Sequence, residues 1–196
     1  MPVNNTELTQ MFEHVLTLSK VDETQSVAIL KSHYSHQQTV QAALDAACRL
    51  KAKVFILELP SFNHPQAMGN DMTAYCGDTA LTGNFAAQQA LESVDLIIDT
   101  MMLLHSPEQE QILKTGTRIL LAVEPPEILA RMLPTQEDKH RVQTAEKYLK
   151  KAKSMHVTSK AGTDFYAPLG QYPAVTEYGF ADEVGRWDHW PSGFLF

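Results

Sequence analysis

Polar residues that could carry chemistry gather in four short segments, each of which follows an apolar run. The segments are residues 32–36 (SHYSH), 60–64 (PSFNH), 100–106 (TMMLLHS) and 124–125 (EP). In an open α/β sheet, ligands bind outside the carboxyl ends of the strands, and these segments lie there if the apolar runs are strands. The sequence therefore predicts that a ligand site is built from these segments.

His105 is a candidate for acid–base chemistry, because it stands just before a helix expected to begin at Pro107. A neutral imidazole in that place can accept a proton, although the positive end of the helix disfavours the charged form. A histidine that caps the helix or packs in the core is the alternative. His33, His36 and His64 lie in the same kind of segment but lack metal-ligand spacing, and they are expected to be solvated or structural.

Glu177 and His189 lie in a stretch that is rich in aromatic residues and has no helical period. A carboxylate and an imidazole among aromatic side chains suit an aromatic ligand that forms hydrogen bonds. A packing surface between domains is the alternative. The neighbouring aromatic residues are Tyr172, Tyr178, Trp187 and Trp190.

Nucleotide and metal motifs are missing from the sequence. No G-x-G-x-x-G follows the first apolar run and no Walker lysine motif occurs, so a nucleotide is not indicated. H-x-H, H-x-x-x-H and H-x-D are also missing, so local motifs do not assemble an iron site of two histidines and a carboxylate. Cys48 and Cys76 are too few and too far apart for a disulfide framework or a zinc motif, and Cys48 is expected in the core.

The composition is that of a globular protein with an acidic balance. The 196 residues are 44% hydrophobic and 20% charged, and the net charge is −7. Because phosphate binding needs a concentrated basic surface, nucleic acid is not an expected partner. No apolar run approaches the ~20 residues that a membrane span requires, and the polar N-terminus does not resemble a secretory signal. We therefore expect a cytoplasmic protein.

Alternating apolar runs and helical patterns predict an α/β fold with a doubly wound, mostly parallel sheet. The expected strands cover residues 26–30, 54–59, 95–98 and 118–123, and their nearly continuous apolar character is typical of strands buried on both faces. Helical patterns lie between them. These cover residues 38–50, 83–94 and 107–114, and a longer helix is expected from 135 to about 153.

The sequence pattern changes after the long helix. Two short strands are expected at residues 155–158 and 164–167, and the chain beyond them is rich in aromatic residues, glycine and proline. We expect an α/β domain at 1–153 and, at 154–196, the beginning of a second, β-rich catalytic domain. The apolar end at 192–196 predicts a chain that stops before its active site is complete. A short edge strand docked on the sheet is the alternative.

Four segments carry a resemblance to a known family. Residues 68–77 (MGNDMTAYCG), 99–110 (DTMMLLHSPEQE), 170–179 (GQYPAVTEYG) and 185–193 (GRWDHWPSG) closely resemble the family of 2,5-dihydroxypyridine 5,6-dioxygenases. The resemblance implies a cytoplasmic enzyme of nicotinic acid degradation that uses Fe(II) and O2 to open the dihydroxypyridine ring, giving N-formylmaleamic acid. It also implies a longer protein. A homo-oligomer is expected as well, although the sequence does not fix its order.

The resemblance further implies roles for three residues of this chain. His105 is implied as the catalytic base, and Glu177 and His189 as residues that bind the substrate. No metal ligand is implied in this chain, because the resemblance places the iron ligands beyond Phe196. The 196-residue chain is therefore expected to be inactive alone.

A second, more distant resemblance lies in residues 190–194 (WPSGF), which look like the metal-ligand segment of thermophilic metallo-aminopeptidases. In those enzymes a glutamate follows the glycine, whereas Phe194 stands here and cannot bind a metal. This difference favours an oxygenase with one iron over a two-metal hydrolase. An aminopeptidase-like hydrolase and a non-catalytic α/β binding module remain the alternatives.

Overall fold

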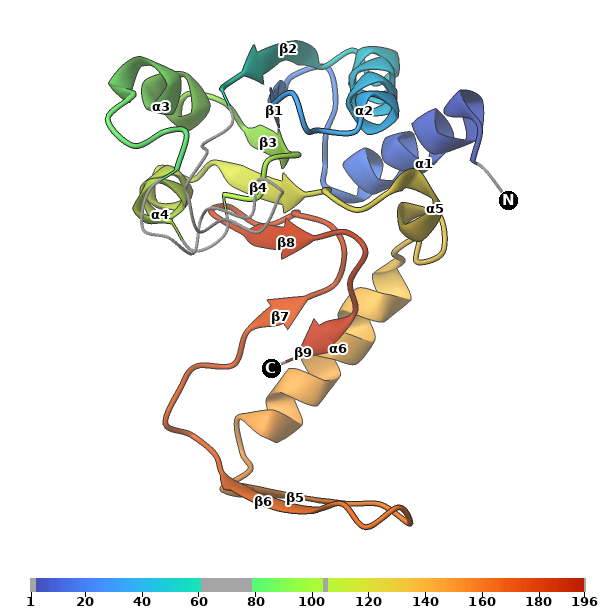
Figure 1. Cartoon of the computed structure of the whole chain (residues 1–196), viewed down its shortest axis with the longest axis vertical. Helices are drawn as coiled ribbons and strands as arrows, with labels where there is room; N and C mark the ends of the chain where they lie inside the picture. Colours follow the sequence, from blue (N-terminus) through green and yellow to red (C-terminus); the bar gives the residue numbers. More distant parts are fainter. Residues whose placement is uncertain (1–2, 61–78, 104–105, 196) are drawn as a thin grey trace.

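The computed structural model describes residues 3–60, 79–103 and 106–195, and its main body is a five-stranded sheet (Figure 1). The strand order is β2-β1-β3-β4-β8, and every neighbouring pair is parallel. This confirms the predicted α/β class and the parallel sheet. The strands are β1 (Ser26–Lys31), β2 (Lys53–Glu58), β3 (Leu96–Asp99), β4 (Arg118–Leu121) and β8 (Trp187–His189).

Helices cover both faces of the sheet, as a doubly wound fold requires. α1 (Asn5–Leu18) and α2 (Gln37–Arg49) pack on one face, and α3 (Phe85–Glu92) and α4 (Pro107–Lys114) on the other (Figure 1). Side chains of β1 alternate between the two resulting cores. Val27 and Ile29 belong to the core under α1 and α2, whereas Ala28 and Leu30 belong to the core under α3 and α4. Apolar side chains on both sides explain the continuous apolar runs.

Two burial predictions were wrong. β2 was expected to be buried on both faces, but Phe55 and Ile56 are 40% and 41% exposed. β2 lies at the edge of the sheet. The helices pack over the centre of the sheet and therefore cover this edge strand incompletely. Cys48 was expected in the core and is exposed, because it lies off the stripe of α2 that buries Val40, Ala43 and Ala47.

The helix starts follow the predicted capping chemistry. Ser106 caps α4, where its Oγ accepts a hydrogen bond from the backbone N–H of Gln109 at 3.1 Å and Pro107 occupies the first turn. Thr135 and Asp138 form a capping box at the start of α6 (Gln136–Leu149). The short helix α5 (Pro126–Leu129) connects the end of β4 to this part of the chain.

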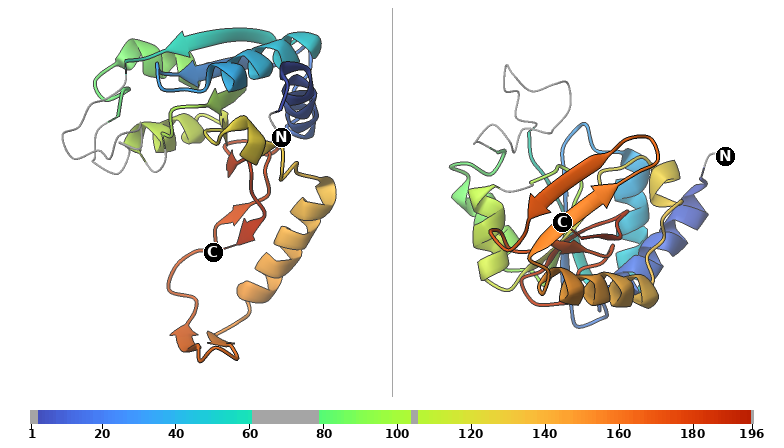
Figure 2. Two further views of the ribbon diagram at one scale, coloured as in Figure 1. Left: turned by 45° about the vertical axis from the view of Figure 1, so that its right-hand side comes forward. Right: turned by 90° about the horizontal axis from the view of Figure 1, so that it is seen from below.

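α6 leads away from the sheet to a hairpin formed by β5 (Ser154–Thr158) and β6 (Asp164–Pro168) (Figures 1 and 2). This confirms the two short strands expected there. Residues paired across the hairpin share a face, so its register gives one apolar face. The apolar face is formed by Met155, Val157, Phe165 and Ala167, and the first three of these are 41%, 41% and 52% exposed.

The chain then returns to the main body. β7 (Thr176–Glu177) and β9 (Phe194–Leu195) form a small antiparallel pair, and β8 between them joins the main sheet beside β4. Trp190 is fully buried, and its ring packs edge-on against Phe12 of α1 with the centroids 4.9 Å apart. Residues of the expected second domain therefore complete the sheet of the first. A domain boundary at 153–154 stays a prediction.

None of the helices in the described ranges is long and apolar enough to cross a membrane.

Candidate active site

A pocket opens at the point where the strand order reverses. The chain runs from β1 outward to β2 and then returns to the other side of β1 with β3, so the carboxyl ends of β1 and β3 flank a crevice. The pocket has a volume of about 310 Å³ and is lined by the loops that follow β1, β3 and β4. It is therefore built from three of the four predicted segments. Of the fourth segment, 60–64, only Pro60 belongs to the described residues. Lining residues include Tyr34, Ser35, His36, Thr100, Met102 and Glu124.

Two buried hydroxyl groups hold the loops of β1 and β3 together beneath this pocket. The Oγ of Ser35 donates to the carbonyl oxygen of Thr100 at 2.9 Å. The Oγ1 of Thr100 donates to the carbonyl oxygen of Leu30 at 2.8 Å and lies 2.9 Å from the Oγ of Ser35. Both side chains are at least nine-tenths buried. These bonds join segments about 65 residues apart and fix the floor of the pocket.

Asp99 shapes the loop that follows β3. Its Oδ1 accepts from the backbone N–H groups of Met101 and Met102 at 2.8 and 2.9 Å, and its Oδ2 accepts from that of Leu103 at 2.8 Å. Met102 has a φ of 67°, which is unfavourable for a residue with a side chain. The fully buried carboxylate thus stabilises a strained turn at the pocket wall.

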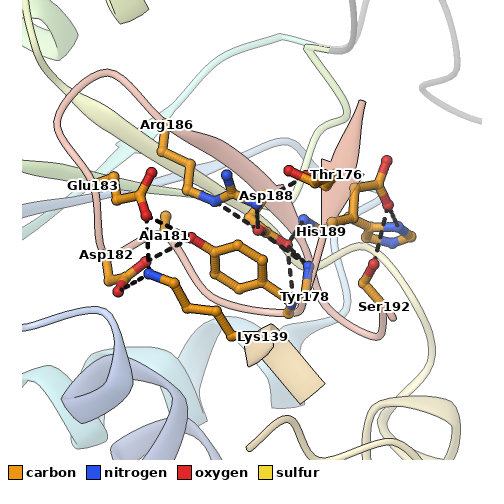
Figure 3. A network of polar contacts seen from close by, with 12 residues as sticks. Lys139, Thr176, Tyr178, Ala181, Asp182, Glu183, Arg186, Asp188, His189 and Ser192 are labelled. Carbon is orange, nitrogen blue, oxygen red and sulfur yellow. Dashed lines mark hydrogen bonds and ion pairs between the residues drawn. The ribbon is translucent and has the colours of Figure 1, made fainter. Parts of the chain in front are cut away.

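The structure brings together the two residues expected to bind substrate. The Nδ1 of His189, at the end of β8, lies 3.8 Å from the Oε2 of Glu177 on β7. The Oγ of Ser192 donates to the same Oε2 at 3.2 Å (Figure 3). Glu177 is 5% exposed. Ser192 was not singled out from the sequence, although it lies within the family-like segment 185–193.

The environment of His189 favours its neutral form. Burial lowers the pKa of the imidazole, and the negative charge of Glu124 acts in the opposite direction. The Nε2 of His189 is buried and has no hydrogen-bond partner among the described residues. A neutral imidazole with one unused ring nitrogen can donate or accept a single hydrogen bond with a ligand.

A buried ion pair supports the strand that carries His189. Asp188 is fully buried and accepts from the backbone N–H groups of Gly179 at 2.7 Å and His189 at 2.9 Å, and from the Nη2 of Arg186 at 2.6 Å (Figure 3). Burial raises the pKa of Asp188 to about 7, and Arg186 and the backbone donors oppose this rise. All of these partners are donors, so the ionised carboxylate is the form that the geometry satisfies.

The same network reaches α6 through Tyr178. The guanidinium carbon of Arg186 lies 3.7 Å from the centroid of the Tyr178 ring, and the tyrosine hydroxyl donates to Asp182 at 2.7 Å. The Nζ of Lys139 on α6 lies 2.6 Å from Asp182 and 2.9 Å from Glu183 (Figure 3). These contacts hold the loop before β8 against the helix, and this network was not predicted from the sequence.

His105 and residues 68–77 lie outside the described residues, so the expected position of the catalytic base stays a prediction. The described neighbours Leu103 and Ser106 are buried. The backbone N–H of Ser106 donates to the carbonyl oxygen of Leu103 at 3.2 Å. In the sequence, His105 lies between these two described residues.

A complete metal site is not formed by the residues that the structure describes. Within those ranges, no group of three or more histidine, cysteine, aspartate or glutamate side chains could hold a metal ion. Glu177 and His189 provide two such side chains, which is fewer than an iron site with two histidines and a carboxylate requires. The described residues therefore do not fit a resident iron by themselves.

The fold and the site define an α/β protein with a polar site at the carboxyl edge of a parallel sheet. Residues 7–196 match the family model described as NicX: 2,5-dihydroxypyridine 5,6-dioxygenase. The chain belongs to this family.

Two relatives cover essentially the whole chain. A 2,5-dihydroxypyridine 5,6-dioxygenase of Pseudomonas putida KT2440 is 80% identical over 196 residues, which are 100% of this chain and 56% of the relative. The solved structure of a 2,5-dihydroxypyridine dioxygenase from the same strain matches with a TM-score of 0.93 and 79% identity, over 99% of this chain and 56% of that one. The chain thus spans a little over half the length of these relatives.

The resemblance to metallo-aminopeptidases at residues 190–194 is not supported by these matches. Phe194, at the position of the peptidase glutamate, belongs to β9 and is 52% exposed.

Proposed function

We propose that this chain provides the substrate-facing part of an Fe(II)-dependent, extradiol-type dioxygenase. The reaction would open the ring of 2,5-dihydroxypyridine with O2 to give N-formylmaleamic acid, in the degradation of nicotinate. The observation that carries the proposal is the pair formed by buried Glu177 and half-buried His189 at the carboxyl edge of the sheet, in a chain 80% identical to an enzyme named for this substrate. We place the enzyme in the cytoplasm, as a homo-oligomer.

In this proposal, Glu177 orients His189. A carboxylate oxygen 3.8 Å from Nδ1 favours the tautomer that carries its proton on that nitrogen. The buried Nε2 then offers a lone pair to a hydroxyl group of the substrate. Because burial favours the neutral imidazole, the lone pair is available at neutral pH.

His105 is the proposed catalytic base. Its side chain would take the proton from a ring hydroxyl of the substrate, so that the oxygen becomes an anion and the imidazole an imidazolium. A histidine suits this step because its ordinary pKa lies near neutral pH. The proposal is supported by Met101 and Met102, sequence neighbours of His105 that line the pocket.

The iron ligands are proposed to lie in the part of the relatives that this chain does not span. When bound, Fe(II) would bring substrate and O2 together at one centre. We expect the 196-residue chain to bind the substrate without turning it over. Release of amino acids from dipeptides would instead favour the aminopeptidase-like hydrolase. A sedimentation coefficient that depends on protein concentration, but not on ligand or metal, would favour the non-catalytic binding module.

Equilibrium binding of 2,5-dihydroxypyridine to this chain tests the proposed substrate site. Trp187 reports on the site, because its ring centroid lies 6.5 Å from that of His189. We expect saturable quenching of tryptophan fluorescence, and about tenfold weaker binding for His189→Gln, since a flexible amide replaces the oriented ring nitrogen in this hydrogen bond. The control is His140→Gln, at an exposed position of α6, which should bind like the unchanged chain. Equal affinity in both variants would remove His189 from the site.

A further inference from the structure

The carboxylate of Glu124 has no role in the network that holds the site together. Glu124 follows β4 and lines the 310 Å³ pocket at the reversal of the strand order. It is half-buried. Within the described ranges, neither a hydrogen-bond donor nor a cation is paired with its carboxylate. A partly buried charge without a partner is unfavourable, so a ligand that supplies a donor would be stabilised there.

The other polar groups of the pocket are already used or face solvent. Ser35 and Thr100 are buried and bonded to each other and to the backbone. Tyr34 is 52% exposed and His36 is also exposed, so both lie at the rim. Among the described side chains that line the pocket, Glu124 is therefore the acceptor that stays available to a ligand.

The size and lining of the pocket suit a small planar ring. Its volume lies at the lower end of the range of ligand pockets, about 300–1,000 Å³. Met101, Met102, Ala122 and Val123 contribute apolar lining, and the Ser35–Thr100 bonds make the floor rigid. A flat ring with one donor at its edge would fill the apolar part and reach the carboxylate.

We propose that this pocket binds a nitrogen heterocycle and that Glu124 recognises the N–H group of its ring. A 2-hydroxypyridine exists also as the pyridone, in which the ring nitrogen carries a proton beside a carbonyl group. A carboxylate that accepts this N–H forms a charge-assisted hydrogen bond, which is the stronger kind. A benzene ring with the same two hydroxyl groups has no such donor.

This assignment rests on the proposed function and makes Glu124 a residue that determines specificity. The carboxylate of Glu124 lines the pocket, and its charge also acts on His189. A pyridone ring held by Glu124 through its nitrogen would leave its 5-hydroxyl group free for His189. Loss of one hydrogen bond to a charged group corresponds to about 10- to 100-fold in affinity.

Calorimetric binding of two rings tests the assignment. The probes are 2,5-dihydroxypyridine and hydroquinone, which differ by the ring nitrogen. In Glu124→Met, which keeps the size of the side chain and removes the acceptor, we expect affinity for the pyridine to fall about 10- to 100-fold and affinity for hydroquinone to stay unchanged. Glu124→Gln, with a neutral acceptor, should lie in between. Glu127→Gln, at an exposed position of α5, is the matched control.

The outcomes separate this assignment from the proposed function. Unchanged binding of the pyridine in Glu124→Met, or an equal loss for both rings, would overturn the role of Glu124. If pyridine binding still depends on His189, the proposed substrate site stands without Glu124. If the unchanged chain binds neither ring, both proposals fail. Thermal unfolding of each variant checks that the fold is intact.

Discussion

The Nδ1 of His189 lies 3.8 Å from the Oε2 of Glu177, although the two residues are on different strands and in different sheets. β8 places His189 at the carboxyl edge of the main sheet, and the β7–β9 pair brings Glu177 beside it. The pair depends on residues 176–195 returning to the main body. The site therefore forms only if residues 176–195 stay packed on the main body.

Asp188→Asn should destabilise the protein strongly. The substitution removes the charge that pairs with Arg186, whose side chain is 13% exposed, and leaves the guanidinium without its anionic partner. Breaking a buried ion pair in this way costs about 3–5 kcal/mol, measured as the free energy of unfolding in urea. Asp164→Asn, in the exposed hairpin, is the control and should change this free energy by less than about 0.5 kcal/mol. A loss below about 1 kcal/mol for Asp188→Asn would contradict the importance of the pair.

Gly179→Ala should destabilise the protein more than Gly170→Ala does. Both glycines have a positive φ, +93° and +92°, so an alanine is strained by about 1–2 kcal/mol at either position. At Gly179 the added Cβ would also meet the Cβ of Pro134 at 2.6 Å, whereas at Gly170 nothing lies within 4 Å. The difference between the two unfolding free energies measures the clash alone. Equal losses would show that Pro134 moves away without effect.

The contribution of His189 to the stability of the protein should fall between pH 7.5 and 5.5, whereas Asp188, whose pKa is raised to about 7, acts in the opposite direction. The pKa of His189 is lowered in the folded state, so the unfolded chain takes up the proton first as the pH falls. The resulting stability is present above the ordinary pKa of about 6.5 and is lost as the pH falls below it. The groups that face His189 are Glu177 and Glu124, and burial outweighs the effect of Glu124.

Urea unfolding at both pH values checks this prediction. His189→Gln should lose part of the pH dependence, because glutamine does not titrate. His140→Gln, at an exposed position, should keep all of it. The same pH dependence in both variants would show that His189 takes up its proton as easily in the folded protein as in the unfolded chain.

The sequence predicted the parts of the fold that local patterns determine. The first four strands and their helices follow from apolar runs, helical periods and caps such as Ser106. β8 was missed because its three residues include a charged one, Asp188, and its place in the sheet depends on pairing with β4, about 70 residues earlier. Burial of a charge is stable there only because Arg186 and backbone donors surround it, and no local pattern reports such long-range contacts.

The candidate site was predictable in its location but not in its contacts. Three polar segments that follow predicted strands in the sequence line the pocket, because parallel strands bring their carboxyl ends to one edge of the sheet. Ser192 was missed because a single serine in a turn carries no pattern, and its bond to Glu177 spans 15 residues. The unpaired state of Glu124 also depends on which side chains surround it in space.

Oxygen uptake with ferrous iron and 2,5-dihydroxypyridine tests the central proposal most directly. Two proteins are compared: this chain alone, and a hybrid that joins it to the part of the Pseudomonas putida relative that it does not span. We predict no turnover by the chain alone and turnover by the hybrid, lowered about 10²–10⁴-fold by His105→Ala. Turnover by the chain alone, or a normal rate in the His105→Ala hybrid, would contradict the account.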